Sequence, residues 1–331
     1  MSETALLNLY RSISPSVGKI YVIPDIEKFS RHNTYLQLLY GNLLDKNSPV
    51  AVQSFSIVPL AIILRRLSGE QSVVHHHWFE CRDFPGLLNV FWKFTILGIY
   101  RFFGGKIVWT VHNRLPHSGK WLRINRFLRK IWSKFPQIIH VHCKSAIQPV
   151  SKELGIPAHR FFVVEHPPYP AQILPADRAK TLLAEQFPNL RFSTKQRIFL
   201  MFGYIAPYKG ILEVAEIFEK MNPDKVLVIA GSVKREGKEY AHALKIIADR
   251  AANIHIITAH IPETEVPLFF NAVDTVIFNY RDILQSGGVV LARSYHKTVI
   301  VPTIGCLKEL TGSDVHHFEN IDHLNKIISA L

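Results

Sequence analysis

The chain has little cysteine, and the cysteines that it has are widely spaced. Cys81, Cys143 and Cys306 are far apart and odd in number, so their pattern indicates neither a disulfide framework nor a zinc site. Residues 1–18 lack a basic start followed by a continuous apolar stretch, and no secretory signal is predicted there. We therefore expect a protein of the reducing cytoplasm.

Acidic side chains are also in short supply, with 26 against 39 lysines and arginines and a formal net charge of +13 at pH 7. Such a surface attracts polyanions, namely nucleic acid, phosphate-bearing ligands or an anionic bilayer. With 48% hydrophobic and 20% charged residues, the composition excludes a largely disordered or collagen-like chain. The length of 331 residues suits two α/β domains of roughly 150 residues each.

Short β-branched runs alternate with longer helical patterns along the chain. This alternation predicts an α/β fold of two doubly wound, Rossmann-like domains with parallel sheets. Strands are expected at 19–24, 50–54, 72–76, 106–111, 137–142, 161–164, 197–203, 225–230, 254–258, 275–279 and 298–301. A proline-rich stretch predicts a linker at 167–196, between domains at 1–166 and 197–331. Ligands of such sheets bind at the carboxyl ends of the strands, so we expect the domains to face a central cleft.

Two strand-to-helix junctions of the second domain carry residue types suited to phosphate. Residues 203–210 combine glycines, which allow close backbone approach, with Lys209, which would project a cation into the cleft. Residues 285–289 place Ser286 and two glycines at a helix start, where free N–H groups and the dipole attract anions. A solvated lysine in an ordinary turn and a capping serine are the alternative interpretations.

Histidine-rich segments follow two strands of the first domain. One segment holds His75, His76, His77, Trp78 and Glu80, and the other holds His112, Asn113 and His117. Histidine and carboxylate on the ligand side of a sheet suit a general base or a sugar-hydroxyl contact. Three consecutive strand residues point to alternate faces, so the histidine run cannot converge on one metal ion. A purely structural role is the alternative.

The helix expected at 121–135 is basic and amphipathic, a composition typical of an anionic membrane interface. Its candidate membrane-contact residues are Trp121, Arg123, Arg126 and Lys130. Leu87–Phe103 is apolar, but its seventeen residues include two cations and are short for a membrane span. We expect a peripheral protein at the cytoplasmic, inner face of the cell membrane. Core-packing helices with solvated basic faces are the alternative.

The chain resembles GT-B glycosyltransferases, most closely the bacterial exopolysaccharide β-mannosyltransferases of the xanthan-assembly type. Similar elements occur in the same order: Asn33-Thr34-Tyr35-Leu36 with Leu39-Tyr40, His77-Trp78 with Glu80, Thr110-Val111-His112-Asn113 with Pro116-His117, Phe202-Gly203 with Pro207-Tyr208-Lys209-Gly210, and Ser286-Gly287 with Leu291-Ala292. The broader retaining GT-B pattern has two glutamates eight positions apart, where this chain has Gln285 and Arg293. This departure speaks against a retaining outcome.

The resemblance implies an acceptor-binding first domain and a nucleotide-sugar-binding second domain. The implied donor-binding residues are Gly203, Tyr208, Lys209, Gly210, Arg281, Ser286, Gly287, Gly288 and Val289. The implied acceptor-binding residues are Asn33, Tyr35, His77, Trp78 and Asn113. Glu80 is the first candidate for the catalytic base and His117 the second, while His112 faces the reacting sugar.

The expected reaction is the inverting transfer of a hexose to a lipid-linked oligosaccharide in exopolysaccharide synthesis. GDP-mannose is the expected donor, with no cofactor and no metal, because cationic and backbone donors would stabilise the leaving diphosphate. One alternative is a retaining transferase that uses a UDP-sugar. Another is a non-catalytic protein that binds sugar nucleotides or nucleic acid. No nucleic-acid motif appears, and we expect no nucleic-acid partner.

Overall fold

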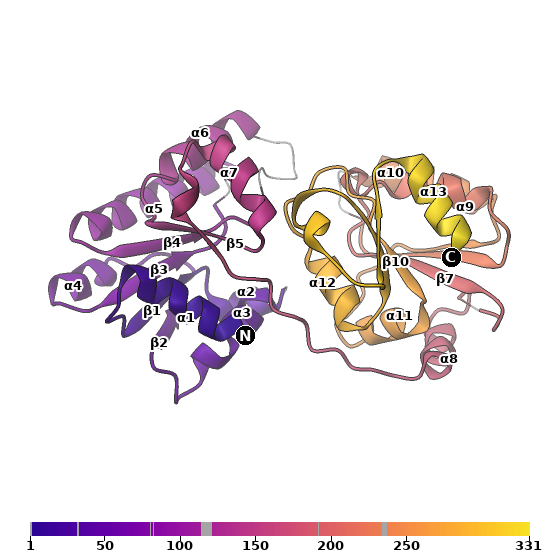
Figure 1. Cartoon of the computed structure of the whole chain (residues 1–331), viewed down its shortest axis with the longest axis horizontal. Helices are drawn as coiled ribbons and strands as arrows, with labels where there is room; N and C mark the ends of the chain where they lie inside the picture. The colour runs from indigo at the N-terminus through magenta and orange to yellow at the C-terminus, as the bar shows by residue number, and fades with distance from the viewer. Residues whose placement is uncertain are drawn as a thin grey trace. The chain divides into compact units, whose positions relative to one another are not determined.

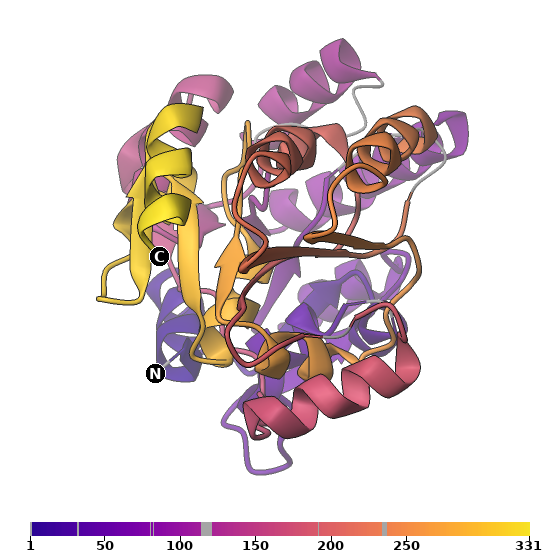
Figure 2. The same ribbon diagram turned by 90° about the vertical axis from the view of Figure 1, so that its right-hand side faces the viewer.

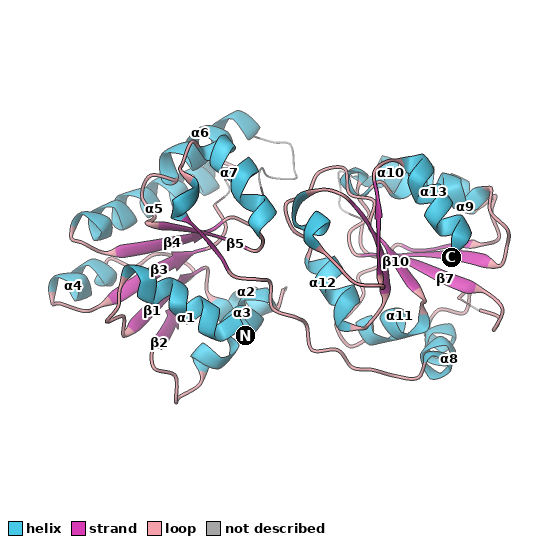
Figure 3. Cartoon of the chain, viewed as in Figure 1, coloured by secondary structure: helices cyan, strands magenta, loops and turns pink. Residues whose placement is uncertain are grey.

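The structure, a computed structural model, describes residues 2–31, 33–79, 81, 83–113, 121–190, 192–233 and 237–331. It divides the chain into two units, Met1–Pro167 and Pro168–Leu331 (Figure 1). Strands and helices alternate within each unit (Figure 3). Each unit is built on one six-stranded parallel sheet, so the prediction of two doubly wound α/β domains is confirmed.

The sheet of the first unit has the strand order β2-β1-β3-β4-β5-β6. Its strands are β1 (Lys19–Ile23), β2 (Ala51–Ser54), β3 (Ser72–His76), β4 (Lys106–Thr110), β5 (Ile138–Val141) and β6 (Phe161–Val163). The central strands β3 and β4 are almost entirely buried, as parallel strands covered on both faces must be. The carboxyl ends of β3, β4 and β5 therefore lie next to one another, where the histidine-rich segments begin.

Helices cover both faces of this sheet. They are α1 (Ser2–Ile13), α2 (Ile26–Ser30), α3 (Tyr35–Tyr40), α4 (Ala61–Leu67), α5 (Phe84–Phe102), α6 (Leu122–Trp132) and α7 (Ile147–Leu154). Figure 1 shows α5, α6 and α7 on one face and α1 and α3 on the other. Leu6 and Leu9 of α1 and Leu36 of α3 are fully buried in the core on the second face. The same core contains Ile20 and Val22 of β1 and Val73 of β3.

The sheet of the second unit has the strand order β12-β11-β10-β7-β8-β9. Its strands are β7 (Arg197–Phe202), β8 (Lys225–Ala230), β9 (Ile254–Ile257), β10 (Thr275–Ile277), β11 (Thr298–Pro302) and β12 (Val315–Phe318). Its helices are α8 (Ala176–Gln186), α9 (Ile211–Glu219), α10 (Lys238–Ala248), α11 (Val266–Ala272), α12 (Gly287–Ser294) and α13 (Ile321–Ala330). One apolar core lies beneath α8, α11 and α12 and the other beneath α9, α10 and α13. Figure 2 shows α13 lying over the strands at its end of this sheet.

The last helix, α13, is fastened at both ends. At its start Asn320 accepts a hydrogen bond from the N–H of His323 at 2.9 Å. At its end the ammonium of Lys225, the first residue of β8, donates to the carbonyl oxygens of Ile328 at 2.7 Å and Ser329 at 2.6 Å. A cation at a helix C-terminus satisfies carbonyls that have no intrahelical partner and complements the dipole.

The stretch predicted as a linker, 167–196, belongs largely to the second unit. Its helix α8 packs on α11, with Ala179 and Leu183 fully buried in the core of that unit. Residues before α8 are also anchored, since the N–H of Tyr169 donates to Ser294 Oγ at 3.0 Å. The i, i+4 spacing of Ala179 and Leu183 puts both on one helix face. This apolar face explains why the segment packs on the second unit instead of forming an extended linker.

Candidate donor and acceptor sites

The two junctions predicted to hold a diphosphate lie side by side in the second unit. One follows β7 and the other follows β10, and these strands are neighbours in the sheet. The side-chain amide of Asn279 donates to the carbonyl oxygen of Gly210 at 2.8 Å. The N–H of Arg281 donates to the carbonyl oxygen of Tyr208 at 3.0 Å. The strand order therefore joins the loop of Lys209 to the segment that leads into α12.

Gly210 is required by its surroundings. Its φ of +58° lies in the left-handed region, and a Cβ there would stand 2.4 Å from the side-chain nitrogen of Asn279. Only glycine combines that backbone conformation with so close an approach. Gly203, at the other end of the loop, has a φ of +89°. These two glycines set the path of the chain around Lys209.

The side chain of Lys209 turns back over the end of β7. Its ammonium donates to the carbonyl oxygen of Phe202 at 2.8 Å. Burial lowers the pKa of Lys209 to about 8, because removal from water disfavours the charged form. An anion placed beside this ammonium would restore the missing stabilisation of the charge. The geometry therefore suits the binding of a negatively charged ligand beside Lys209.

Ser286 begins α12 and already has two hydrogen-bond partners. Its hydroxyl oxygen accepts from the N–H of Val289 at 3.3 Å, as an N-cap does. It also lies 2.9 Å from the hydroxyl of Tyr280, whose ring stacks on that of Tyr208. The capping alternative for Ser286 therefore describes its contacts. The N–H groups of Gly287 and Gly288, in the first turn, remain the helix donors that can face an anion.

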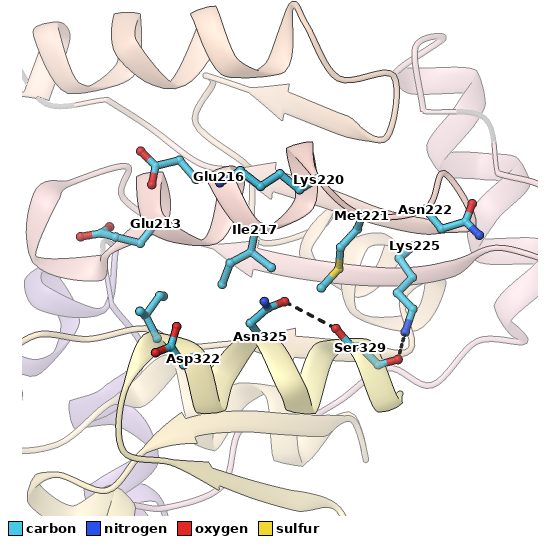
Figure 4. A pocket seen from close by; sticks show the side chains of 11 residues that line it. Glu213, Glu216, Ile217, Lys220, Met221, Asn222, Lys225, Asp322, Asn325 and Ser329 are labelled. Carbon is cyan, nitrogen blue, oxygen red and sulfur yellow. Dashed lines mark hydrogen bonds between the residues drawn. The ribbon is translucent and has the colours of Figure 1, made fainter.

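Arg281, a predicted donor-binding residue, forms an ion pair with Glu213 of α9. Its side chain is 62% exposed, so the pair is solvent-facing. Glu213 also lines a hollow of about 570 Å³ between α9 and α13, together with Asp322 (Figure 4). None of the predicted site residues lines that hollow. Arg293, which stands where the retaining GT-B pattern has its second glutamate, also forms an ion pair. Its Nε lies 3.4 Å from a carboxylate oxygen of Asp314.

Four of the predicted first-unit residues form one cluster. The ring of Trp78 stacks on that of His112, with centroids 4.3 Å apart and planes 7° apart. His112 Nε2 lies 3.3 Å from His77 Nδ1. Tyr35 meets His112 edge to face at 5.0 Å, and its hydroxyl lies 3.0 Å from His142 Nε2. Within the cluster, the ring nitrogens of His77 and His112 thus face each other.

The remaining predicted acceptor residues have local structural partners. Asn33 accepts a hydrogen bond from the N–H of Tyr35 at 2.9 Å, which shapes the start of α3. The carbonyl oxygen of Asn113 accepts from the guanidinium of Arg129 at 2.7 Å. Glu80 and His117, the two candidate bases, lie outside the described residues. Their roles stay predictions.

The histidine run divides between the two faces of the sheet, as the alternation predicts. His75 and His77 stack on each other with centroids 4.3 Å apart, whereas His76 packs against Trp132 on the other face. Neither ring nitrogen of His76 has a hydrogen-bond partner among the described residues. Within that same part of the chain, no three His, Cys, Asp or Glu side chains are grouped to hold a metal ion.

The sequence interpretation missed several buried members of this cluster. His140 on β5, His142 just after it and Tyr10 on α1 were not singled out, while His75, Thr110 and Tyr40 were named only within longer motifs. Burial lowers the pKa of each of these histidines, to about 4 for His140, so all are neutral at pH 7. The signal available in the sequence was polar residues two apart at the ends of three adjacent strands: 75 and 77, 110 and 112, 140 and 142.

The candidate membrane-contact side chains lie on α6 and just before it. Trp121, Arg123, Arg126 and Lys130 are all exposed. Arg126 forms an ion pair with Glu153, in which its Nε lies 3.3 Å from Oε1 of the glutamate. Arg129, another cation of this helix, is instead buried and lies over the ring of Trp109. The described helices include none that is long and apolar enough to cross a membrane.

Comparison with known proteins agrees with this architecture. Residues 184–319 match the family described as Glycosyl transferases group 1. Over 312 residues the chain is 22% identical to the GDP-mannose:glycolipid 4-beta-D-mannosyltransferase of Xanthomonas campestris pv. campestris, an alignment that covers 91% of this chain and 78% of that protein.

Solved structures share the fold of the whole chain. Anabaena HepE, crystallised with UDP, superposes with a TM-score of 0.64 at 12% identity, over 95% of this chain and 89% of that one. Sucrose-phosphate synthase from Thermosynechococcus elongatus gives the same TM-score at 10% identity, with the same coverage. The two Rossmann-like sheets, the group 1 match and these relatives identify the chain as a glycosyltransferase with the GT-B fold.

Proposed function

We propose that this glycosyltransferase moves a hexose, mannose from GDP-mannose, to a lipid-linked oligosaccharide in exopolysaccharide synthesis, with inversion at the anomeric carbon. The observation that carries the proposal is the adjacency of the Lys209 loop and the start of α12 on neighbouring strands. The name of the Xanthomonas relative supports the choice of donor and of a glycolipid acceptor. The Gln285 and Arg293 positions favour inversion over retention.

On the donor side, the Lys209 ammonium and the first N–H groups of α12 hold the diphosphate. Gly203 and Gly210 let the backbone approach it, and Tyr208 and Val289 line its surroundings. A buried cation and oriented N–H groups stabilise the negative charge that grows on a leaving diphosphate. This is the task that a divalent metal performs in other transferases, so we propose that none is needed.

On the acceptor side, the first unit supplies the catalytic base and the saccharide contacts. Glu80 is the first candidate for the base, because it follows His77 and Trp78 in a segment where an aromatic ring can support a sugar face. Glu80→Gln should keep donor affinity and lower turnover by roughly 10²–10⁴-fold, the usual contribution of general-base catalysis. Near-normal turnover in Glu80→Gln, together with a folded but inactive His117→Ala, would move the role to His117.

The donor is tested directly by calorimetry with GDP and UDP, followed by hydrolysis and transfer assays across GDP- and UDP-sugars. Preferential binding of GDP and transfer of mannose, with a β-anomer seen by NMR of the product, is the expected result. The second candidate is a retaining transfer from a UDP-sugar, the kind of donor that is bound in the structures of Anabaena HepE with UDP and UDP-glucose. Tight UDP binding and an α-linked product would select it.

We also propose that the enzyme works as a peripheral protein at the cytoplasmic face of the cell membrane. Between Asp83 and Glu153 the chain has twelve lysines and arginines and no acidic residue. Helices α5 and α6 of this region, and α4 before it in the sequence, expose large apolar side chains, among them Leu64, Leu67, Leu88, Phe91, Phe102, Ile124 and Phe127. Cations beside exposed apolar side chains fit the headgroups and outer acyl chains of an anionic bilayer.

Co-sedimentation with anionic vesicles tests this surface. Binding should weaken as salt rises, because headgroup attraction is screened. Replacing Arg123, Arg126 and Lys130 by glutamate should release the protein and leave donor hydrolysis intact. The matched control reverses three exposed lysines of the second unit, Lys195, Lys238 and Lys326, with the same change in net charge. Equal binding by both triple variants would contradict the proposed surface.

A further inference from the structure

A chain of side-chain hydrogen bonds crosses the first unit from the end of β6 to α1. It begins at the carbonyl oxygen of Val164 and passes through His140, Thr110 and His75 to the hydroxyls of Tyr10 and Tyr40. A branch continues from Tyr40 through His77 to His112. All members except His112 are buried. Protons in such a chain can be assigned by counting donors and acceptors.

The assignment starts at Val164, because a carbonyl oxygen can only accept. His140 Nε2 lies 3.0 Å from this oxygen and His142 Nδ1 lies 2.8 Å from it, so both nitrogens carry hydrogen. Both imidazoles are neutral, since burial lowers their pKa. Their other nitrogens are therefore bare. His142 Nε2 accepts from the Tyr35 hydroxyl, and His140 Nδ1 accepts from Thr110 at 2.8 Å.

The next links follow from the single proton of a hydroxyl. Thr110 gives its proton to His140, so its oxygen accepts from His75 Nε2 at 2.7 Å. The neutral His75 then has a bare Nδ1 with one in-plane lone pair. The hydroxyls of Tyr10 and Tyr40 each lie 2.6 Å from it. One tyrosine donates to His75, and the other must donate elsewhere.

Distance decides between the two tyrosines. Tyr40 has a second good acceptor in His77 Nε2, at 2.9 Å. Besides His75, the hydroxyl of Tyr10 has only the Tyr40 hydroxyl within reach among the described residues, at 3.3 Å. All protons find short acceptors only if Tyr10 donates to His75 and Tyr40 donates to His77. His77 then carries its hydrogen on Nδ1 and donates it to His112 Nε2 at 3.3 Å.

We infer that Tyr10, acting through Tyr40 and His77, holds His112 in the tautomer with hydrogen on Nδ1, so that His112 presents an N–H donor to an oxygen of the bound saccharide. Tyr10 and Tyr40 are thus positioning residues for His112. The stacked ring of Trp78 fixes the plane in which this N–H lies. His112 is a donor here and not a base, because its Nε2 is occupied by His77 and its Nδ1 is protonated. The saccharide contact rests on the proposed function, whereas the tautomer does not.

The tautomer is read from ¹⁵N–¹H correlation spectra of the full chain labelled with ¹⁵N-histidine. A protonated ring nitrogen resonates far from a bare one, and the His112 signals are those missing from His112→Gln. Hydrogen on Nδ1 of His112 is the expected result. In Tyr10→Phe, Tyr40 turns to His75 and His77 reverses, so hydrogen should move to His112 Nε2. Tyr100→Phe is the control, since Tyr100 donates to the Ser72 carbonyl at 2.8 Å outside this chain, and it should leave His112 unchanged.

Hydrogen on Nε2 in the unmodified protein, or an unchanged His112 in folded Tyr10→Phe, would overturn the inference. If Tyr10→Phe fails to fold, Tyr40→Phe interrupts the same series of hydrogen bonds at a second place. It should leave His112 in a mixture of tautomers. Retention of Nδ1–H alone in Tyr40→Phe would count against it. These spectra need no sugar ligand, so they stand or fall separately from the identity of the donor and acceptor.

Kinetics then tests the saccharide contact. Asparagine places an amide N–H near the position of histidine Nδ1, whereas glutamine places it near Nε2. His112→Asn should therefore keep more turnover than His112→Gln, by roughly fivefold to tenfold, which corresponds to one hydrogen bond. The loss should appear in kcat with little change in the KM of the donor. Equal loss in both variants would show that His112 does not act through an Nδ1–H donor.

Discussion

The side-chain amide of Asn279 donates to the carbonyl oxygen of Gly210 and so fastens the segment after β10 to the loop after β7. Both segments were singled out from the sequence for their likeness to phosphate-binding turns, although 69 positions separate the bonded residues. Their contact means that the ammonium of Lys209 and the first turn of α12 belong to one local structure within the second unit. We propose that a single diphosphate engages both.

Lys209→Ala should weaken binding of a nucleoside diphosphate by about 1.5–3 kcal/mol, the range for hydrogen bonds to charged groups. Without a bound ligand, Lys209 has a pKa of about 8. The affinity of the unmodified protein for the nucleoside diphosphate should therefore fall as the pH rises through that value and the cation is lost. The alanine variant should lack this pH dependence. Calorimetry from pH 7 to pH 9 measures both effects. Lys245→Ala, an exposed site on α10, is the control, and an equal response there would remove Lys209 from the site.

Gly210→Ala should destabilise the second unit by about 2 kcal/mol or more, because alanine pays for a positive φ and meets Asn279 at 2.4 Å. Nucleotide affinity should fall with it, since the loop of Lys209 must move. Urea unfolding followed by circular dichroism gives the stability. Gly18→Ala is the matched change, because nothing lies within 4 Å of a Cβ added there. A Gly210→Ala protein as stable as Gly18→Ala would contradict the packing described.

The first unit should lose stability in mild acid. Its buried histidines have a lowered pKa in the folded state, whereas unfolded histidine titrates near about 6.5. Above that pH neither state binds the proton. Below it the unfolded chain takes up protons that the folded unit refuses, so stability falls by about 1.4 kcal/mol per pH unit for each such histidine.

All five tryptophans, at 78, 92, 109, 121 and 132, lie in the first unit, so fluorescence during urea unfolding reports on that unit alone. The urea midpoint should drop steadily from pH 7 to pH 5. A midpoint that stays constant across this range would show that the histidines are not buried in their neutral form.

His76→Leu should leave the first unit as stable as before or raise its stability by about 1 kcal/mol. Both ring nitrogens of His76 are buried without a partner among the described residues, and an apolar side chain of similar size removes that cost. His140→Leu is the contrasting change, because it removes the acceptor of the Thr110 hydroxyl and one of the two donors to the carbonyl oxygen of Val164, and it should cost about 1–3 kcal/mol. Tryptophan fluorescence in urea compares them, and a His76→Leu loss as large as that of His140→Leu would refute the assignment.

The strands could be predicted from the sequence because their apolar runs are continuous, as buried parallel strands require. β12 was missed, since Val315–Phe318 holds two histidines and lies at the sheet edge, where burial is partial. The Lys209 loop and the Ser286 turn could be named individually, but their contact depends on the strand order that puts β10 beside β7. That order is a non-local property, which no local pattern encodes.

The histidine and tyrosine chain was predicted least well. Its strand members recur every second residue and could have been recognised, but Tyr10 and Tyr40 come from α1 and α3, where they look like ordinary core aromatics. Only the packing of those helices beneath the sheet turns their hydroxyls toward His75. The proton assignment at His112 therefore depends on side chains to which the sequence analysis assigned no role.

The fastening of α13 has a practical consequence for work at the bench. Lys225 stands at the amino end of β8 and holds the last turn of α13 there, whereas Gly203 and Ser286 follow the carboxyl ends of β7 and β10. Leu331 therefore lies at the amino ends of the strands, opposite the carboxyl ends where the proposed diphosphate site lies. An affinity tag or fluorescent label attached after Leu331 should leave nucleotide binding unobstructed, and immobilisation through that end is the natural choice for surface-based binding measurements.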